Sequence, residues 1–259
     1  MSRIPPGVLQ EAVRRPLGCV GDSLLRYAII SDLHANLPAL TAVLDEIDRV
    51  GVDRIVCLGD VVGYNANPNE CVKIIRERQI PTLCGNHDAV ACGTADPWGF
   101  NPIALAAALW TRQNLEPSHL AWLRGLPDSQ RFPDFLAVHG SPTNRDIYLF
   151  GWEDAMPQMN FLRSQSISLC FFGHTHCPGI FSMDGVYTIK NGAGLVLGED
   201  DVFLVNPGSV GQPRDGDPRA AYGIFDTETR EFQLARVAYP VEQAAGRIIE
   251  AGLPQFLAE

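Results

Sequence analysis

Residues 26–34 read RYAIISDLH, a short apolar run followed, after one serine, by Asp32 and His34. Four later stretches repeat this arrangement of an apolar run followed by Asp, Asn or His: 54–60 RIVCLGD, 80–88 IPTLCGNHD, 135–140 FLAVHG and 168–176 SLCFFGHTH. Apolar runs of this length predict buried strands. In open α/β sheets ligands bind at the carboxyl ends of strands, so we expect the five polar ends to converge on one site.

The segments between the first three runs have helical spacing. Apolar side chains recur at Leu37, Leu40, Val43, Leu44 and Ile47, and the pattern ends at Gly51. A second helix is expected over residues 69–78. Strands that alternate with helices predict an α/β fold with a parallel sheet and right-handed crossovers.

The remainder of the chain predicts a helix-rich middle and a β-rich end. Helices are expected over 102–115, over a segment capped by Ser118 that runs through 126, and over 241–251. After Pro178, short apolar runs separated by turn residues predict antiparallel hairpins that form a second sheet. No linker or repeat interrupts the pattern. We therefore expect one domain over residues 26–259, after a proline-broken leader, 1–25, to which no chemistry is assigned.

Composition excludes several classes of protein. The chain has 259 residues, 46% hydrophobic and 19% charged, which excludes disordered, collagen-like and coiled-coil proteins. Its 20 basic and 30 acidic residues give a net charge of −10, which would repel nucleic-acid backbones and anionic membranes. The expected partner is therefore something small, with no long nucleic acid and no membrane. The oligomeric state is left open.

Cysteine usage and the first 25 residues favour a cytoplasmic location. The 7 cysteines form no C-x-x-C pair, and Cys57, Cys84 and Cys170 lie within or at the end of apolar runs. No run approaches the roughly 18 apolar residues of a membrane span. Residues 1–25 also lack the continuous apolar core of a secretory signal.

The polar strand ends carry a set of metal-ligand residue types. Seven candidates follow the apolar runs: Asp32, His34, Asp60, Asn86, His139, His174 and His176. Mixed imidazole and carboxylate ligands suit Mn, Fe, Ni or Zn better than Mg or Ca. Seven ligands are too many for one centre that must also admit a substrate. Two ions about 3.5 to 4 Å apart that share a carboxylate accommodate them and indicate hydrolysis. His119 lies outside any strand end and is assigned no role.

These residues, in this order, resemble the calcineurin-like metallophosphoesterase superfamily, and specifically its small single-domain prokaryotic branch. The family pattern of D-x-H, G-D-x-x-G, G-N-H-[DE], an isolated H and G-H-x-H is matched by 32–34, 59–63, 85–88, His139 and 173–176. The resemblance covers roughly residues 26 to 240. One departure is Ala35, where the family often has Gly.

The resemblance implies a fold, a ligand assignment and a mechanism. The fold would be two mixed β-sheets packed as a sandwich flanked by helices. Asp32, His34 and His176 would hold one metal ion, Asn86, His139 and His174 the other, and Asp60 would bridge both. A hydroxide shared by the ions would attack phosphorus in line. His87 would stabilise the transition state and protonate the leaving oxygen, and Asp88 would fix the tautomer of His87 and raise its basicity.

Weaker candidates lie near the same loops. Arg145 and Arg214 are candidate substrate-binding residues, and Tyr64 and Trp98 are candidates for a base-stacking wall. The turn at 206–209 is read as a tight structural turn in preference to an anion-binding nest.

The resulting hypothesis is a two-metal phosphodiesterase acting on small or nucleotide-like esters. The alternatives are a protein or dinucleoside-polyphosphate phosphatase with the same chemistry, and an inactive scaffold, which the intact ligand set disfavours.

Overall fold

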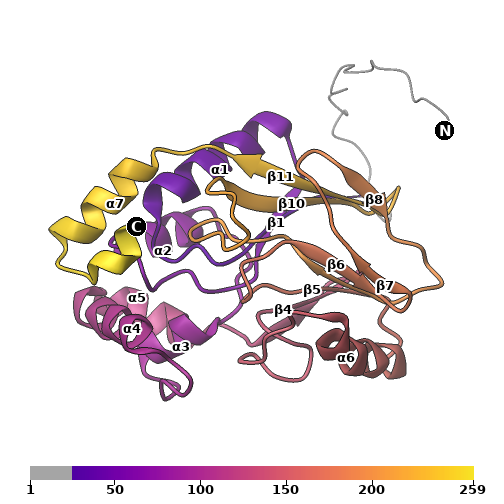
Figure 1. Cartoon of the computed structure of the whole chain (residues 1–259), viewed down its shortest axis with the longest axis horizontal. Helices are drawn as coiled ribbons and strands as arrows, with labels where there is room; N and C mark the ends of the chain where they lie inside the picture. The colour runs from indigo at the N-terminus through magenta and orange to yellow at the C-terminus, as the bar shows by residue number, and fades with distance from the viewer. Residues whose placement is uncertain (1–24) are drawn as a thin grey trace.

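The computed structural model describes residues 25–259, which form two mixed β-sheets packed face to face (Figure 1). The first sheet has the strand order β2-β1-β10-β11-β8 and the second β3-β4-β5-β9-β6-β7. The strands are β1 (Arg26–Ile30), β2 (Arg54–Cys57), β3 (Ser129–Arg131), β4 (Leu136–Val138), β5 (Leu169–Phe171), β6 (Gly179–Ser182), β7 (Gly185–Tyr187), β8 (Gly194–Val196), β9 (Phe203–Asn206), β10 (Ala220–Asp226) and β11 (Glu231–Val237). The helices are α1 (Leu37–Val50), α2 (Pro68–Glu77), α3 (Asn86–Cys92), α4 (Pro102–Asn114), α5 (Pro117–Arg124), α6 (Trp152–Ser164), α7 (Val241–Glu250) and the 3₁₀ turn η1 (Gln255–Ala258).

Alternation along the central strands produces the layers. In β1, Tyr27 and Ile29 point into the core between the sheets, whereas Ala28 and Ile30 point toward the helices. Successive side chains of a strand face opposite sides, so a strand that is apolar throughout must be covered on both. The core between the sheets is rich in aromatic rings: Tyr27, Phe135 and Phe171 meet edge to face.

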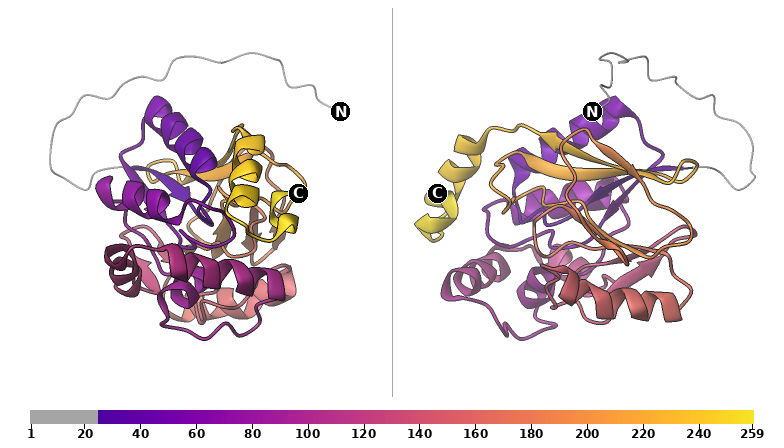
Figure 2. Two further views of the ribbon diagram at one scale, coloured as in Figure 1. Left: turned by 90° about the vertical axis from the view of Figure 1, so that its left-hand side faces the viewer. Right: turned by 45° about the vertical axis from the view of Figure 1, so that its right-hand side comes forward.

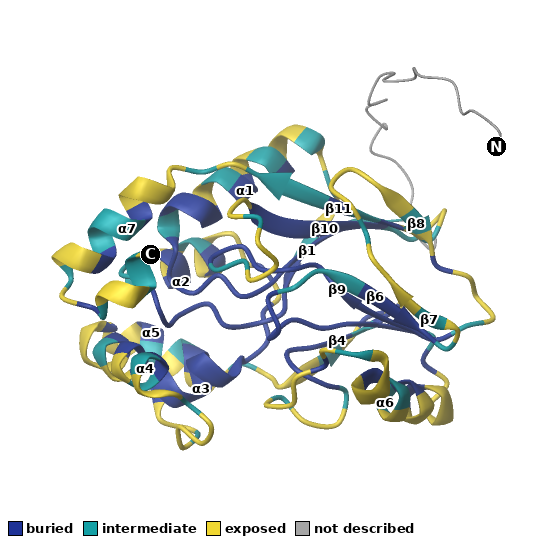
Figure 3. Cartoon of the chain, in the orientation of Figure 1, coloured by how far each residue is buried: buried dark blue, intermediate teal, exposed yellow. Residues whose placement is uncertain are grey.

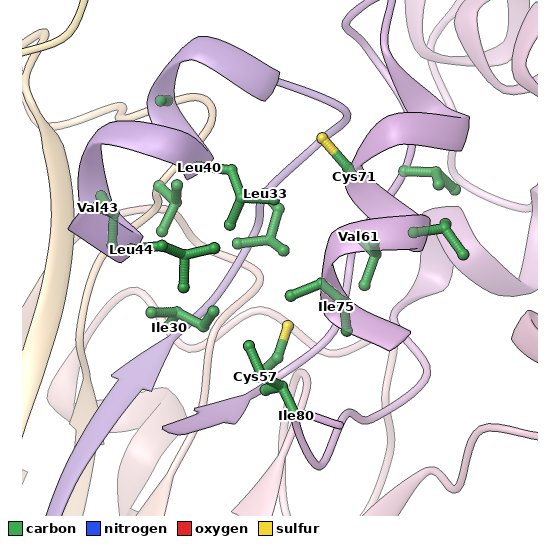
Figure 4. Close-up of a cluster of buried hydrophobic side chains, with 14 of the residues drawn as sticks. Ile30, Leu33, Leu40, Val43, Leu44, Cys57, Val61, Cys71, Ile75 and Ile80 are labelled. Carbon is green, nitrogen blue, oxygen red and sulfur yellow. The ribbon is translucent and has the colours of Figure 1, made fainter. Parts of the chain in front are cut away.

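Helices cover the outer face of each sheet. α1 and α2 pack on the first sheet through a cluster that includes Leu40, Val43 and Ile75, and Figure 4 shows these side chains facing those of Ile30 and Cys57. α6 covers the second sheet through Met159 and Leu162. The sandwich flanked by helices is therefore confirmed, and Figure 3 shows that central strands such as β9 and β10 are buried, whereas β7 and β8 at the sheet edges are more exposed.

A group of helices lies beside one end of the sandwich. α3, α4 and α5 pack together there, and α7 with η1 lies above them next to α1 (Figure 2). A small apolar cluster joins these elements: Tyr64, Ala104, Ala107, Ile248 and Leu253. No helix in residues 25–259 combines the length and apolar character needed to cross a membrane.

Several expectations are confirmed and four are corrected. β1 and β2 are parallel neighbours in the sheet, and α1 connects them along the chain. Residues 80–84, expected as a strand, make only the single bridge between Cys57 and Thr82, because Pro81 supplies no N–H to a ladder. Glu116, not Ser118, is the N-cap residue of α5, since Pro117 occupies its first turn.

The other two corrections concern strand placement and helices. The late strands do not form a sheet of their own: β8, β10 and β11 join β1, whereas β6, β7 and β9 join β5. α3 and α6 were not expected from the periodicity, because α3 is short and α6 contains Pro157. The proposed leader, except Leu25, lies outside the described residues.

Candidate dinuclear metal centre

The seven candidate ligands gather at one end of the sandwich, and all are buried. Asp32 and His34 follow β1, Asp60 follows β2, His139 follows β4, His174 and His176 follow β5, and Asn86 begins α3. Five of them, namely Asp32, His34, Asp60, His174 and His176, have φ between 45° and 66°. A left-handed backbone costs a non-glycine residue about 1–2 kcal/mol. The fold therefore holds these side chains in place at the expense of backbone strain, as is common at functional sites.

Asp60 is at the centre of the cluster. Its Oδ2 atom lies 3.5 Å from His34 Nε2 and 3.4 Å from His139 Nε2. Within the described part of the chain this buried oxygen has no hydrogen-bond partner. Two groups of potential ligand atoms meet here and share Asp60: Asp32, His34, Asp60 and His176 form one, and Asp60, His139 and His174 form the other. This arrangement fits a carboxylate shared by two cations.

Backbone carbonyls orient three of the histidine rings. Nδ1 of His34 lies 3.1 Å from the Val62 carbonyl oxygen, Nδ1 of His139 2.9 Å from that of Leu58, and Nδ1 of His176 2.7 Å from that of Gln212. When Nδ1–H donates to a carbonyl, Nε2 carries the lone pair that binds a metal. His34 Nε2 and His176 Nε2 are only 3.0 Å apart. Two facing lone pairs repel unless a cation or a proton lies between them, so this pair also fits a metal site.

The pKa shifts in the cluster are those expected of a site that a cation stabilises. Burial raises the pKa of Asp32 to about 6, and it lowers the pKa of His34 and His176 well below the ordinary value. Burial lowers the pKa of His139, but the Asp60 and Asp32 carboxylates and the Leu58 carbonyl together outweigh it and raise that pKa to about 9. A cation beside Asp60 would take the place of that proton.

Asp88 has a different role from the one that the resemblance implied. Its Oδ2 accepts a hydrogen bond from the Gly85 N–H (3.0 Å) and its Oδ1 accepts one from the Val62 N–H (3.1 Å). The first contact caps α3 and the second holds the loop after Asp60. His87 Nδ1 has no hydrogen-bond partner among the described residues, so Asp88 does not fix its tautomer. Adjacent helical residues point about 100° apart, which directs Asp88 to its own helix end.

Comparison with known proteins identifies the family. Residues 25–230 match the model of the calcineurin-like phosphoesterase superfamily domain. The chain belongs to this superfamily. It is 38% identical to a metallophosphoesterase of known structure from Sphaerobacter thermophilus, with a TM-score of 0.80 over 91% of this chain and 97% of the other. An uncharacterized protein of Methanocaldococcus jannaschii is 38% identical over 236 residues, or 90% of this chain and 95% of that protein. Phosphodiesterase YfcE of Escherichia coli is 26% identical over 209 residues, or 79% and 89%.

The resemblance drawn from the motifs is thus confirmed, and the chain is a phosphoester hydrolase.

In this calcineurin-like phosphoesterase, the His87 side chain lies beside the metal-ligand cluster and is packed between two aromatic rings. Its ring centroid is 4.4 Å from that of Tyr64 and 4.5 Å from that of Phe100. A Cβ atom at Gly63 would lie 2.6 Å from His87 Nδ1, which explains the second glycine of the G-D-x-x-G motif. Burial lowers the pKa of His87 to about 4.

The two arginine candidates are in different surroundings. Arg145 pairs with Asp128 (2.9 Å) and Asp146 (3.2 Å), and it does not line the pocket that contains His87. Arg214 does line that pocket, with its guanidinium carbon 5.6 Å from the centre of the Tyr64 ring. Of the two, the structure brings only Arg214 to the mouth of the site.

The turn at 206–209 serves the site through hydrogen bonds. Asn206 Nδ2 donates to the Gly173 carbonyl (2.8 Å) and to Thr175 Oγ1 (2.9 Å), and Ser209 Oγ donates to the Asp32 carbonyl (2.9 Å). These bonds tie the Asp32 and His174 loops together across the two sheets. The turn is structural, as the sequence favoured.

Aromatic side chains that the sequence did not single out cover the centre. The Tyr148 ring stacks on His174 with centroids 3.7 Å apart, and Phe100 packs on His87. Tyr64 lines the pocket with His87, whereas Trp98 lines a second pocket with His174. Tyr148 and Phe100 lie in loops without periodicity, and no local signal in the sequence distinguishes them from other surface aromatics.

Proposed function

We propose that the chain is a two-metal phosphodiesterase that acts on small or nucleotide-like diesters. The observation that carries this proposal is the position of Asp60 Oδ2 between His34 and His139, shared by two ligand groups. One ion would be held by Asp32, His34 and His176, the other by Asn86, His139 and His174, and both by Asp60. The residue types favour Mn, Fe, Ni or Zn.

The protein residues would divide the remaining tasks. When bound, two such ions lower the pKa of a water molecule and neutralise charge on phosphoryl oxygens. Arg214, at the mouth of the site, would bind the phosphate or its substituent through charge-assisted hydrogen bonds. His87 would donate a proton to the leaving oxygen, since the negative charge of a bound phosphate favours its protonated form. Phe100 and Tyr64 would shield that transfer from water.

A diester is supported by the shape of the site. Two cavities, of about 360 Å³ and about 100 Å³, share Asn86, Gly99, Phe100 and Tyr148 in their walls. One contains His87 and the other His174, so the two adjoining cavities offer space for two substituents of a phosphate near the cluster. The relative YfcE, which is named a phosphodiesterase, also supports a diester substrate.

The test is a substrate panel with purified protein loaded in turn with Mn, Fe, Ni and Zn. We expect bis-p-nitrophenyl phosphate to be hydrolysed well above p-nitrophenyl phosphate, phosphopeptides and dinucleoside polyphosphates. Elemental analysis should find about two ions per chain. A preference for phosphopeptides or dinucleoside polyphosphates would establish the alternative phosphatase. No turnover with any metal would indicate a scaffold.

We further propose that the protein works in a reducing compartment such as the cytoplasm. The six described cysteines are all free, and five of them are buried. Burial raises the pKa of Cys57, Cys71 and Cys170, which keeps these thiols unreactive. Thiol titration of denatured protein isolated without reductant should find every cysteine free, and a disulfide would contradict this location.

A further inference from the structure

The 3₁₀ turn η1 forms part of the pocket that contains His87. Phe256 and Leu257, in the 3₁₀ turn η1, line the cavity of about 360 Å³ that also contains His87 and Arg214. The turn is held there by packing: Leu257 contacts the cluster of Tyr64, Ala104 and Ile248 that joins α7 to α4. Figure 1 shows this C-terminal segment above α4, far in sequence from the ligand loops.

One wall of this pocket is apolar and carries an unshielded ring. Phe100, Ile103, Ala104, Phe256 and Leu257 supply apolar surface. Phe256 is 68% exposed although the turn that carries it is packed against the protein. When a second ring covers a large aromatic side chain that faces a pocket and is open to solvent, the contact is favourable and stabilises the complex.

The charge of the pocket restricts what it can bind. Its lining contains no carboxylate, and Arg214 is its one Lys or Arg side chain. Arg214 forms no ion pair in the described part of the chain; its Nη2 donates to Gln212 Oε1 (2.7 Å). Although the chain has a net charge of −10, this pocket suits a neutral or anionic group.

The pocket is also the one on the proton donor's side. His87 lines this cavity and not the smaller one, which contains His174 and Trp98 instead. A leaving oxygen must lie within hydrogen-bond reach of its proton donor. The group bound here is therefore the arm of the ester that departs.

We propose that Phe256 and Phe100 form a ring-binding subsite that selects phosphodiesters with an aromatic leaving arm, such as an aryl group or a nucleobase-bearing group. This rests on the proposed function, because it assigns the arm of the diester that His87 protonates. Phe256 is then a specificity-determining residue contributed by η1.

The experiment measures binding apart from turnover. Calorimetry on the full chain, metal-free and with Mn, compares methyl benzylphosphonate with methyl propylphosphonate, in which a carbon–phosphorus bond prevents departure of the arm. We expect Phe256→Ala and Phe256→Leu to weaken benzyl binding about three- to tenfold, as one aromatic contact predicts, with propyl binding unchanged. Phe256→Tyr should restore benzyl binding.

A matched control lies on the neighbouring helix. Ile249 in α7 is 62% exposed, similar to Phe256, but does not line the pocket, so Ile249→Ala should bind both phosphonates as the native protein does. Equal weakening of both ligands by Phe256→Ala, or of neither, overturns the subsite. Failure of the native protein to hydrolyse methyl p-nitrophenyl phosphate with any metal would instead overturn the proposed function. The calorimetry would still test the ring-binding subsite, because it measures binding without turnover.

Discussion

Gly85 lies directly against the carboxylate of Asp60: a Cβ atom at position 85 would overlap Asp60 Oδ1 and lie 2.7 Å from its Cγ. The glycine of the G-N-H-D motif therefore leaves the space that the shared carboxylate occupies. His87 N–H donates to the same Oδ1 (2.9 Å), so the start of α3 and Asp60 position each other.

Replacing this glycine should disrupt both metal sites together. We expect Gly85→Ala to displace the Asp60 carboxylate, to lower metal content and to reduce kcat/KM about 100-fold, the usual effect of an ångström-scale misplacement. Elemental analysis and diesterase assays measure the two effects. Gly246→Ala is the control, since a Cβ there meets nothing within 4 Å. Native metal content and activity in Gly85→Ala would show that Asp60 is not held in this way.

A carboxylate shared by two ions should lose both when its charge is removed. Asp60→Asn is expected to lower the occupancy of both sites in parallel, measured by elemental analysis after dialysis against a weak chelator. Asp48→Asn, at a surface pair with Arg78, serves as the control. Loss of one ion with full retention of the other would contradict the bridging position.

His87 should matter most where the leaving group needs a proton. His87→Ala should keep both ions and lose about 10²–10⁴ of the rate on alkyl diesters, with a smaller loss on p-nitrophenyl esters, whose leaving group is already stable as an anion. His119→Ala, in a histidine that contacts Asn69 away from the site, should retain native rates. An equal loss on both substrate types would argue against proton donation.

Replacement of the two arginines should have different effects on KM, measured by steady-state kinetics. Arg214→Ala is expected to raise KM about 10- to 100-fold, the range for one hydrogen bond to a charged group. Arg145→Ala should leave KM unchanged, because its guanidinium is paired with Asp128 and Asp146. The reverse result would place Arg145 at the substrate.

Asp88 should act on stability. Asp88→Ala leaves the buried N–H groups of Gly85 and Val62 without their acceptor, at about 1–3 kcal/mol each. For a chain of this size, each kcal/mol lowers Tm by about 2–4 °C. Thermal unfolding of the metal-free protein measures the effect. A reduced kcat with an unchanged Tm would instead support the tautomer role.

Local pattern predicted much of the site because the ligands occur where strands end. Asp32 and His34 can be found in the sequence since β1 is one short apolar run, and the chemistry of a side chain does not depend on its distant neighbours. The same reasoning was wrong for residues 80–84, where apolar character suggested a strand but the ladder contains only the Cys57–Thr82 bridge. Local pattern also did not predict the division of the late strands between two sheets, because strand pairing depends on contacts between residues far apart in sequence.

The sequence by itself determined the family, the ligand residue types and the alternation of strands and helices, since each is written in short stretches of chain. Only the tertiary structure decided that Asp88 caps α3, that Arg214 rather than Arg145 reaches the pocket, and that Phe256 lines the same cavity as His87. These are relationships between side chains from different elements. Their physical basis is packing and hydrogen bonding between segments that the order of residues along the chain does not bring together.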